Sequence, residues 1–354
     1  MVRALSLFSG SLASRVAARL VERSPGVDEV FLLHFRSPFF EEYEGIREIA
    51  KREWPGLSFR TQSLKKDYRR LANIPPGGCF SLKRSCQGCR RLMLARAVRY
   101  MRRIQADFLV TGEVVGEHGL SAADMERAAN ALGIQDILLR PLSARLLPPT
   151  RAEEAGWVDR RLLGDLTTQD TRELVEVARG LGLDASDPMS SGLRCRLTYP
   201  GFGRRLEILF EEEGFTMNAL RLLDFRLYYK RLPDVNIVLA MDEEEKRALQ
   251  NYFLPRDLRV YLPIHRGPMT LVRTDWDTKS AAEVRAIIEL AGRITVTHSE
   301  AIRLASVPIN YRFESDDETL QSNALPFGSV DDIADFCLTP NPPSAVSARL
   351  PARP

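Results

Sequence analysis

The feature that most constrains the fold is a regular alternation of short apolar runs with helical patterns over roughly the first 200 residues. Runs such as Ala4 to Phe8 are typical of buried strands, and Leu12 to Glu22 has its apolar residues at helical spacing. This alternation predicts an α/β fold with a parallel, Rossmann-like sheet covered on both faces. Further strands are expected at 29–35, 57–61, 108–110 and 137–139, and helices at 41–52, 90–105, 121–132 and 171–180.

The second half of the chain has a different character, and 354 residues are enough for two domains. Strand patterns there are joined by tight turns and interrupted by a charged helix, which predicts a small α+β module. We expect strands at 225–229, 236–240, 259–264, 269–274 and 293–297, and a helix at 242–252. The expected organisation is a nucleotide-binding α/β domain at 1–150, a connecting helical arm at 151–203, an α+β domain at 204–337 and a disordered tail at 338–354.

Composition excludes several classes of protein. With 44% hydrophobic and 27% charged residues, the chain resembles neither a disordered, a collagen-like nor a coiled-coil protein. No apolar stretch approaches the roughly 20 residues that cross a bilayer, and the segment from Met1 to Phe8 lacks the long apolar region of a signal peptide. We therefore expect a cytoplasmic protein without membrane contact.

Positive charge is concentrated between Lys83 and Arg103, although the net charge of the chain is only +3. This stretch contains eight basic residues and no acidic one. It predicts either a solvated helix face or a surface that binds the phosphates of a nucleic acid. The candidate RNA-binding residues are Arg90, Arg91, Arg96, Arg99 and Arg103.

The candidate nucleotide site lies in three loops, which follow the first strand, the second strand and the strand at 108–110. Ligands of parallel sheets bind beyond the carboxyl ends of the strands. After the first strand, a Ser/Gly turn leads into a helix, which forms either an anion site or a plain turn. His34 lies at the end of the second strand. It is either a nucleotide-binding residue or catalytic base, or a polar residue whose hydrogen bonds are satisfied within the fold. The candidate residues are Ser9, Gly10, Ser11, Ser14, His34, Thr111 and Gly112.

The chain has five cysteines, at positions 79, 86, 89, 195 and 337. Without an export signal, they indicate metal binding or catalysis rather than disulfides. Cys86 and Cys89 form a CxxC placed just before the expected basic helix. This motif is a redox pair, half of a metal site, or two ordinary buried cysteines. Together with Cys195 they form a poor closed zinc site, but three thiolates can hold a four-iron cluster with one open iron.

Several of these segments together resemble a known family. The sequence from Ser9 to Ser14 is similar to the SGGxDS pyrophosphate (PP) loop of the adenine nucleotide alpha-hydrolase fold. Residues 3–200 resemble the short form of the tRNA 4-thiouridine synthetase family, which lacks THUMP and rhodanese domains. The segments that carry this likeness are His34-Phe35, Ser37-Pro38-Phe39-Phe40, Cys86-x-x-Cys89-Arg90, Thr111-Gly112-Glu113-Val114, Arg140-Pro141-Leu142-Ser143-Ala144, Pro148-Pro149-Thr150 and Gly156-Trp157-Val158-Asp159. From Arg204 onward the chain is similar to the RNA-binding module of NFACT proteins.

The resemblance implies a tRNA-thiolating sulfurtransferase that uses ATP with Mg²⁺. ATP adenylates a uracil oxygen, and sulfur then displaces AMP. Cys86 and Cys195 are the implied catalytic residues, and Cys86, Cys89 and Cys195 are the implied ligands of a [4Fe-4S] cluster. The implied partners are tRNA and a sulfur donor, either a protein or sulfide, with a second copy of the chain as a further candidate.

The chain departs from the family pattern at several positions of one pocket. Ser11 replaces the second glycine of the loop, Ala13 replaces its aspartate, and Leu193-Arg194 replaces the Gly-Gly before the third cysteine. Residues 117–122 also differ from the Gln-Arg-Pro-Met-Ser-Gln of the relatives. These losses predict impaired ATP activation. They leave open the alternative of a catalytically inactive relative that binds RNA or a partner protein, and a small-molecule amide-forming or cyclase enzyme is a third reading.

Overall fold

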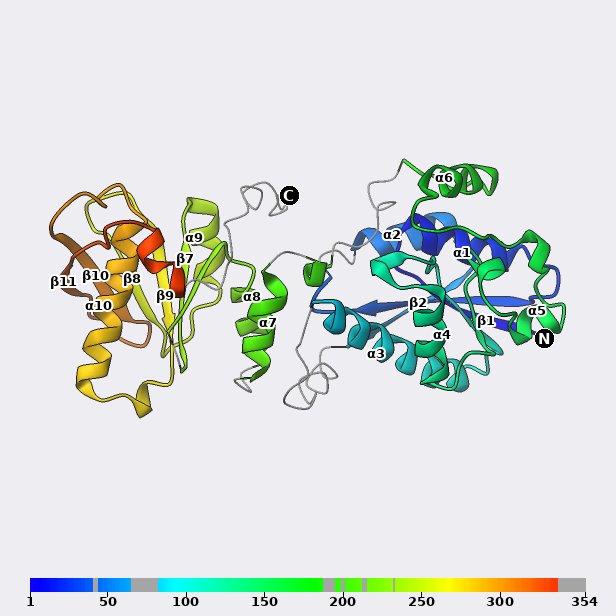
Figure 1. The fold of residues 1–354 in the computed structure, drawn as a ribbon, viewed down its shortest axis with the longest axis horizontal. Coiled ribbons are helices and arrows are strands. Elements are labelled where there is room, and N and C mark those ends of the chain that lie inside the picture. The colour runs from blue at the N-terminus through cyan, green and yellow to red at the C-terminus, as the bar shows by residue number, and fades with distance from the viewer. Residues whose placement is uncertain are drawn as a thin grey trace. The chain divides into compact units, whose positions relative to one another are not determined.

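The computed structural model describes residues 1–40, 44–64, 82–186, 195–198, 201–211, 215–231 and 233–336. The chain divides into two compact units, Met1–Tyr199 and Pro200–Pro354 (Figure 1). Each unit has its own sheet and is described by itself below. The expected tail lies outside the described residues, as do Cys79 and Cys337.

The sheet of the first unit is parallel throughout, which confirms the expected α/β fold. Its strand order is β3-β2-β1-β4-β5, so the chain reverses its direction of travel across the sheet between β1 and β4. Such a switch point opens a crevice at the carboxyl ends of the two strands. The strands are β1 (Arg3–Leu7), β2 (Glu29–Arg36), β3 (Ser58–Ser63), β4 (Phe108–Val110) and β5 (Leu138–Leu139).

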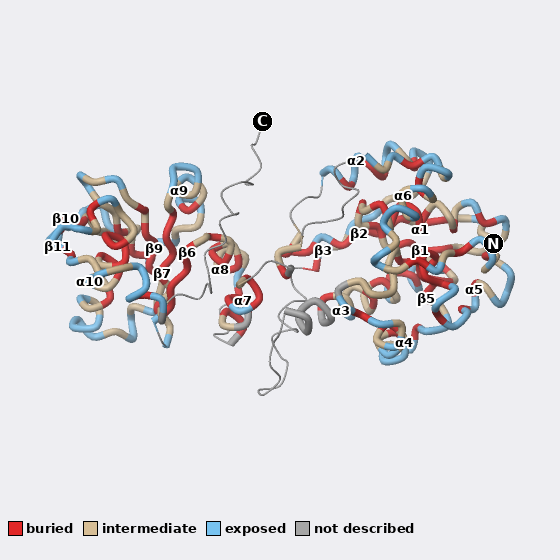
Figure 2. Tube along the Cα trace, turned by 45° about the horizontal axis from the view of Figure 1, so that its top comes forward, coloured by how far each residue is buried: buried red, intermediate tan, exposed pale blue. Residues whose placement is uncertain are grey.

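Helices lie on both faces of this sheet, with α1 and α2 on one face and α3 and α4 on the other (Figure 1). Helix α6 packs against α1. The helices are α1 (Leu12–Glu22), α2 (Glu44–Glu53), α3 (Leu82–Arg103), α4 (Ala122–Asn130), α5 (Arg151–Glu154) and α6 (Thr171–Gly180). Short 3₁₀ turns occupy Glu117–Gly119, Ala144–Leu146, Arg160–Leu162 and Arg196–Thr198. Buried residues follow the strands and the inner sides of the helices (Figure 2).

Helix α3 begins at Leu82, eight residues before the expected start at Arg90. The CxxC therefore lies inside the helix and not before it, which corrects the sequence-based placement. Gly88 stands within this segment, and glycine costs about 1 kcal/mol in a helix interior. The Leu, Met, Ala and Arg residues that follow are strong helix formers, and the helix continues through the glycine.

The second unit has an antiparallel sheet of order β11-β10-β8-β9-β7-β6, packed against α10. Its strands are β6 (Leu227–Arg231), β7 (Val235–Ala240), β8 (Leu258–Tyr261), β9 (Met269–Arg273), β10 (Val307–Phe313) and β11 (Leu320–Ala324). Its helices are α7 (Phe202–Glu211), α8 (Met217–Leu222), α9 (Glu243–Gln250) and α10 (Ala281–Thr297), and 3₁₀ turns occupy Trp276–Thr278 and Asp331–Phe336. No helix of the described chain is long and apolar enough to cross a membrane.

The expected strand at 293–297 is wrong, because these residues form the last turns of α10. Their β-branched side chains favour a strand locally. The helix begins with a capping box between Ser280 and Glu283, and its later turns bury Ile294 and Val296 in the core. Gly292 allows the close approach, since a Cβ there would lie 2.4 Å from the Ile309 Cδ1 atom. Tertiary packing therefore overrides the local preference.

Candidate functional site

The turn between β1 and α1 has the shape expected for an anion site but uses different residues. Gly10 has a φ of 82°, a left-handed conformation that favours glycine, and a Cβ there would lie 3.2 Å from the Ile46 Cγ1 atom. Ser11 has a φ of −61° and caps α1 by accepting a hydrogen bond from the Ser14 N–H at 3.2 Å. The serine that replaces the second family glycine is therefore unstrained, so the loss of that glycine does not distort the turn.

The serine side chains of this turn bond to one another. The Ser9 and Ser11 hydroxyl oxygens are 2.9 Å apart, and the Ser14 hydroxyl donates to the Ser11 carbonyl oxygen at 2.9 Å. The Ser9 N–H donates to the Ser14 hydroxyl oxygen at 3.3 Å. No acidic residue occupies the first turn of α1, where Ala13 replaces the family aspartate. The turn is thus fixed by neutral groups and lacks a carboxylate for a metal ion.

The loop after β4 packs directly on the first turn of α1. A Cβ on Gly112 would lie 2.5 Å from the Ser14 backbone nitrogen, so only glycine fits without movement of one backbone. The neighbouring Thr111 is buried, and its N–H donates to the Leu139 carbonyl oxygen at 3.1 Å. The structure therefore brings the candidate residues after β1 and β4 together at the switch point of the sheet.

His34 lies in the core at the end of β2, with only 2% of its surface exposed. Its Nδ1 atom lies 2.9 Å from the Phe8 carbonyl oxygen, and because that oxygen can only accept, Nδ1 carries the proton. Burial lowers the pKa of His34 to about 4, although the hydrogen bond to Phe8 opposes the shift. The ring also stacks on Phe59. These contacts account for His34 as a neutral packing residue.

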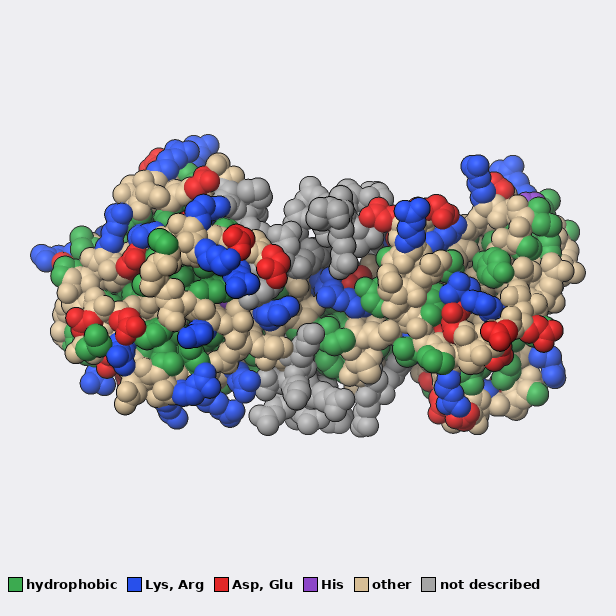
Figure 3. Space-filling model, turned by 180° about the vertical axis from the view of Figure 1, so that it is seen from behind, with side chains coloured by type: hydrophobic (Ala, Val, Ile, Leu, Met, Phe, Trp, Pro, Cys, Tyr) green, Lys and Arg blue, Asp and Glu red, His purple; other side chains and the backbone are tan. Residues whose placement is uncertain are grey.

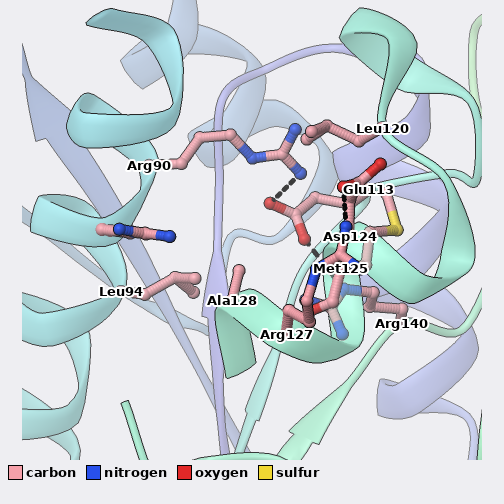
Figure 4. Close-up of a pocket in the computed structure, with 10 residues that line it drawn as sticks. Arg90, Leu94, Glu113, Leu120, Asp124, Met125, Arg127, Ala128 and Arg140 are labelled. Carbon is pink, nitrogen blue, oxygen red and sulfur yellow. Dashed lines mark hydrogen bonds and ion pairs between the residues drawn. The ribbon is translucent and has the colours of Figure 1, made fainter. Parts of the chain in front are cut away.

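A carboxylate that was not among the candidate site residues lies one residue beyond Gly112, with 17% of its side chain exposed. Glu113 binds two guanidinium groups, with Arg90 Nη2 at 2.5 Å from Oε1 and Arg140 Nε at 2.9 Å from Oε2 (Figure 4). Burial alone would raise the pKa of Glu113, but the charges and hydrogen bonds of Arg90 and Arg140 outweigh it and lower the pKa to about 2. The side chain of Arg90 is thus directed at Glu113 rather than at open solvent.

This carboxylate forms part of a pocket of about 240 Å³ between α3 and α4. The pocket combines charged and apolar side chains from four parts of the chain (Figure 4). Its lining residues are Arg90, Arg91 and Leu94 of α3, Glu113 and Leu120 of the loop after β4, Asp124, Met125, Arg127 and Ala128 of α4, and Arg140 after β5. Glu113 and Arg140 carry opposite charges after β4 and β5, but this pattern indicates a site only once the pairing of the two strands is known.

Two of the three candidate cluster cysteines can be placed. Cys89 is buried in α3, and Cys195 forms a β-bridge with Phe40, which follows β2. The Arg196 N–H donates to the Phe39 carbonyl oxygen at 2.9 Å, and the turn Arg196–Thr198 contacts α3. The side chain of Cys86 and residues 193–194 lie outside the described part. Among the side chains that are described, no group of three or more His, Cys, Asp and Glu residues could hold a metal ion.

The remaining candidate RNA-binding arginines lie further along α3. Arg91, Arg99 and Arg103 are exposed, Arg96 is half-buried, and Arg103 stacks over the Tyr100 ring at 4.8 Å. On the molecular face shown in Figure 3, lysine and arginine side chains are interspersed with acidic ones. The basic stretch therefore divides into Arg90 and Arg91, which line the pocket, and Arg96, Arg99 and Arg103, which do not.

Comparisons with known proteins give distant likenesses only. No family model matches the chain, and no curated protein matches it. The U34-tRNA thiolase NcsA from Methanococcus maripaludis, solved with its [4Fe-4S] cluster, is similar at 17% identity, with 63% of this chain and 71% of that chain covered and a TM-score of 0.31. NMN synthetase from Francisella tularensis is similar at 15% identity, covering 53% and 89%, with a TM-score of 0.27.

A third solved structure is the C-terminal part of the fibronectin/fibrinogen-binding protein from Streptococcus suis, at 8% identity, covering 55% of this chain and 82% of that chain, with a TM-score of 0.27. None of these likenesses identifies a function at such low scores.

Proposed function

We propose that the first unit binds an adenine nucleotide at the crevice between β1 and β4, as a tRNA-thiolating sulfurtransferase-like protein with weakened ATP activation. The observation that carries this proposal is the contact of the Gly112 backbone with the first turn of α1. It aligns two glycine-containing loops at the switch point, where parallel sheets bind ligands. The amides at the start of α1 and the helix dipole favour the phosphates of a nucleotide.

The chemistry follows from the poor leaving-group character of a carbonyl oxygen. Transfer of AMP from ATP to a uracil oxygen makes that oxygen a good leaving group, and a sulfur nucleophile then displaces AMP. In this protein α1 has no acidic residue in its first turn. Mg²⁺ prefers carboxylate oxygens together with phosphates, so its binding at the turn would be weak. Activation is therefore the step that we expect to be impaired.

Cys86, Cys89 and Cys195 are the residues proposed to hold a [4Fe-4S] cluster. The bridge between Cys195 and Phe40, together with the contact of its turn with α3, fits this donor set because it brings two cysteine-bearing segments to one end of the sheet. Thiolates are the normal ligands of such clusters, and three of them leave one iron open for sulfur. Iron and sulfide analysis after anaerobic purification tests this part, with loss of iron expected on Cys89→Ser or Cys195→Ser.

ATP binding by the full chain, measured by calorimetry with Mg²⁺ present, tests the nucleotide site. Gly112→Ala should weaken binding about tenfold, because its Cβ would displace the first turn of α1. Gly56→Ala is the matched control, since a Cβ there meets no atom within 4 Å. Equal affinities of the two variants, or no ATP binding by the unmodified chain, would contradict the proposal.

The alternative function is that of a catalytically inactive relative that binds RNA or a partner protein. The internal bonding of Ser9, Ser11 and Ser14 favours it, because these hydroxyls are already engaged. The variant Ala13→Asp separates the two functions. Increased ATP affinity or turnover would show that only the carboxylate was lost, whereas unchanged absence of binding would favour the inactive relative.

Binding of tRNA is proposed for the exposed arginines of α3 and for the second unit. Affinity of the full chain for tRNA should fall steeply with salt, because bound phosphates release counterions. Arg99→Gln should reduce the slope of log K against log salt by about one. Arg172→Gln, an exposed arginine of α6, should leave the slope unchanged and serves as the control.

A further inference from the structure

The pocket between α3 and α4 contains more positive charge than its carboxylates neutralise. Four arginines, at positions 90, 91, 127 and 140, face two carboxylates, Glu113 and Asp124, so the formal charge of the lining is four minus two, or +2. Glu113 is neutralised by Arg90 and Arg140 at 2.5 and 2.9 Å, and Asp124 pairs with Arg127 at 2.5 Å. The pocket thus favours an anion despite its two acidic residues.

Two hydrogen-bond donors of this lining remain available to a ligand. Arg91 is exposed and makes no hydrogen bond or ion pair with the described residues. Arg140 donates through Nε to Glu113 and through Nη2 to the Met125 carbonyl oxygen, at 2.9 and 3.5 Å. Its Nη1 group makes no hydrogen bond to a described residue. Glu113 fixes the position of the Arg140 guanidinium, whose planar fork suits phosphate oxygens.

The rest of the wall is apolar and the volume is small. Leu94, Leu120, Met125 and Ala128 contribute carbon atoms beside the arginines (Figure 4). The volume of about 240 Å³ lies below the roughly 300 to 1,000 Å³ of pockets that enclose drug-sized ligands. This size suits one phosphate with the adjoining part of a single nucleotide rather than a nucleoside triphosphate.

We infer that this pocket binds the phosphate monoester of a pyrimidine mononucleotide, either free or at the phosphorylated end of an RNA. A phosphate monoester carries a charge of about −1.5 to −2 at neutral pH, which matches the formal +2 of the lining. Arg91 and Arg140 bind its oxygens, and the apolar wall contacts the sugar or base. The choice of a nucleotide as the ligand rests on the proposed function, whereas the choice of a phosphate rests on the pocket itself.

Calorimetric titration of the full chain with UMP and with uridine tests the inference. UMP should bind at least about tenfold more tightly than uridine, because charge-assisted hydrogen bonds form only with the phosphate. Arg91→Gln should weaken UMP binding about tenfold. Arg172→Gln is its control, as it removes the same charge from an exposed position of α6 that does not line the pocket.

A second pair of variants tests the pocket without changing charge. Ala128→Phe fills the cavity and should weaken UMP binding about tenfold or more, whereas Ala123→Phe places the same side chain on an exposed position of α4. Circular dichroism of all four variants confirms that they are folded. Equal affinities within both pairs, or uridine binding as tightly as UMP, would overturn the inference.

Two further titrations separate the ligand sources and the two proposals. If a 5′-phosphorylated oligouridylate displaces UMP, the RNA end is the ligand, and if it does not, the free mononucleotide is; both results support a phosphate-monoester site. Titration with ATP and Mg²⁺ is run on the same samples. ATP binding that is insensitive to Ala128→Phe, without UMP binding, would overturn this inference alone. UMP binding that depends on Arg91, without ATP binding, would overturn only the proposed function.

Discussion

Two parts of one sheet edge differ in how their polar groups are satisfied. The turn between β1 and α1 uses neutral hydroxyls, which bond to one another and to the first turn of the helix. The site around Glu113 uses full charges, and the Nη1 group of Arg140 makes no hydrogen bond to a described residue. The β1–α1 turn resembles a family motif but bonds its hydroxyls internally, whereas the Glu113 site carries charges that can bind a ligand. Likeness to a motif and capacity to bind a ligand are therefore separate properties.

The largest effect on stability should come from removing the charge of Glu113. Glu113→Gln leaves the guanidinium of Arg140, which is 6% exposed, without its anion, so the free energy of unfolding should fall by about 3 to 5 kcal/mol. Urea unfolding at pH 7 measures this loss. Asp165→Asn breaks the exposed pair with Arg145 and should cost at most about 1 kcal/mol. Similar losses in both variants would contradict the assignment of Glu113 as the anion that compensates the buried charge of Arg140.

The same carboxylate predicts a pH dependence at acid pH. Because the pKa of Glu113 is lowered from 4.5 to about 2 in the folded chain, its stabilisation is present above pH 4.5 and is lost as the pH falls toward 2. The loss amounts to roughly 3 kcal/mol. The difference in unfolding free energy between pH 5 and pH 2.5 should therefore be larger in the unmodified chain than in Glu113→Gln. Parallel pH curves would refute the lowered pKa.

His34 is a neutral buried group at the same sheet edge, and its titration can be compared with that of the charged Glu113. Its folded pKa of about 4 lies below the ordinary 6.5. The contribution of the neutral ring to the free energy of unfolding is therefore complete above pH 6.5 and is lost as the pH falls from 6.5 toward 4. NMR titration of the ring protons should show His34 neutral at pH 5.5, with His34→Gln identifying its resonance. His298, whose pKa burial also lowers to about 4, provides an internal comparison. A midpoint near 6.5 for His34 would mean that the ring is solvated.

The contact between the two parts should respond to one added carbon atom. Gly112→Ala should destabilise the chain by about 1 to 3 kcal/mol, since its Cβ would meet backbone atoms of α1 rather than a flexible side chain. Gly56→Ala should change the stability by less than about 1 kcal/mol in either direction. Thermal unfolding of both variants gives the answer. If Gly112→Ala were as stable as the control, the two loops would not be in backbone contact.

The smallest effect concerns the helix cap. Ser11→Ala removes the acceptor for the Ser14 N–H and should cost about 1 kcal/mol, whereas Ser11→Gly should cost only a few tenths. Denaturant unfolding distinguishes the two values. A larger loss for glycine than for alanine would show that the serine has a role other than capping.

The parallel sheet could be predicted from sequence because apolar runs alternate with helical patterns, and local chemistry fixes both. The strand expected at 293–297 was wrong because burial of Ile294 and Val296 in a capped helix outweighed their β-branched character. The start of α3 at Leu82 was also missed, although strong helix formers surround Gly88. The first error comes from tertiary packing, which a local pattern does not contain, whereas the second comes from local helix propensity that continues the helix through Gly88.

The candidate site was predictable in part for a similar reason. The loops after β1 and β4 were identified because strand order places their carboxyl ends together. The role of Glu113 was not, since Arg140 lies 27 residues further along the chain and reaches it only through the pairing of β4 with β5. The candidate roles of His34 and the cysteines depend on ligands that a sequence does not contain, and they stay predictions.

Gly112 and Glu113 are consecutive, and this adjacency has a mechanical consequence. One residue is in backbone contact with α1, and the next binds two guanidiniums on the opposite side of the sheet. The peptide group that joins them is planar and rigid. A ligand that shifted the two arginines would therefore act one residue away from the contact with the helix start, and any coupling that resulted would be equal in both directions.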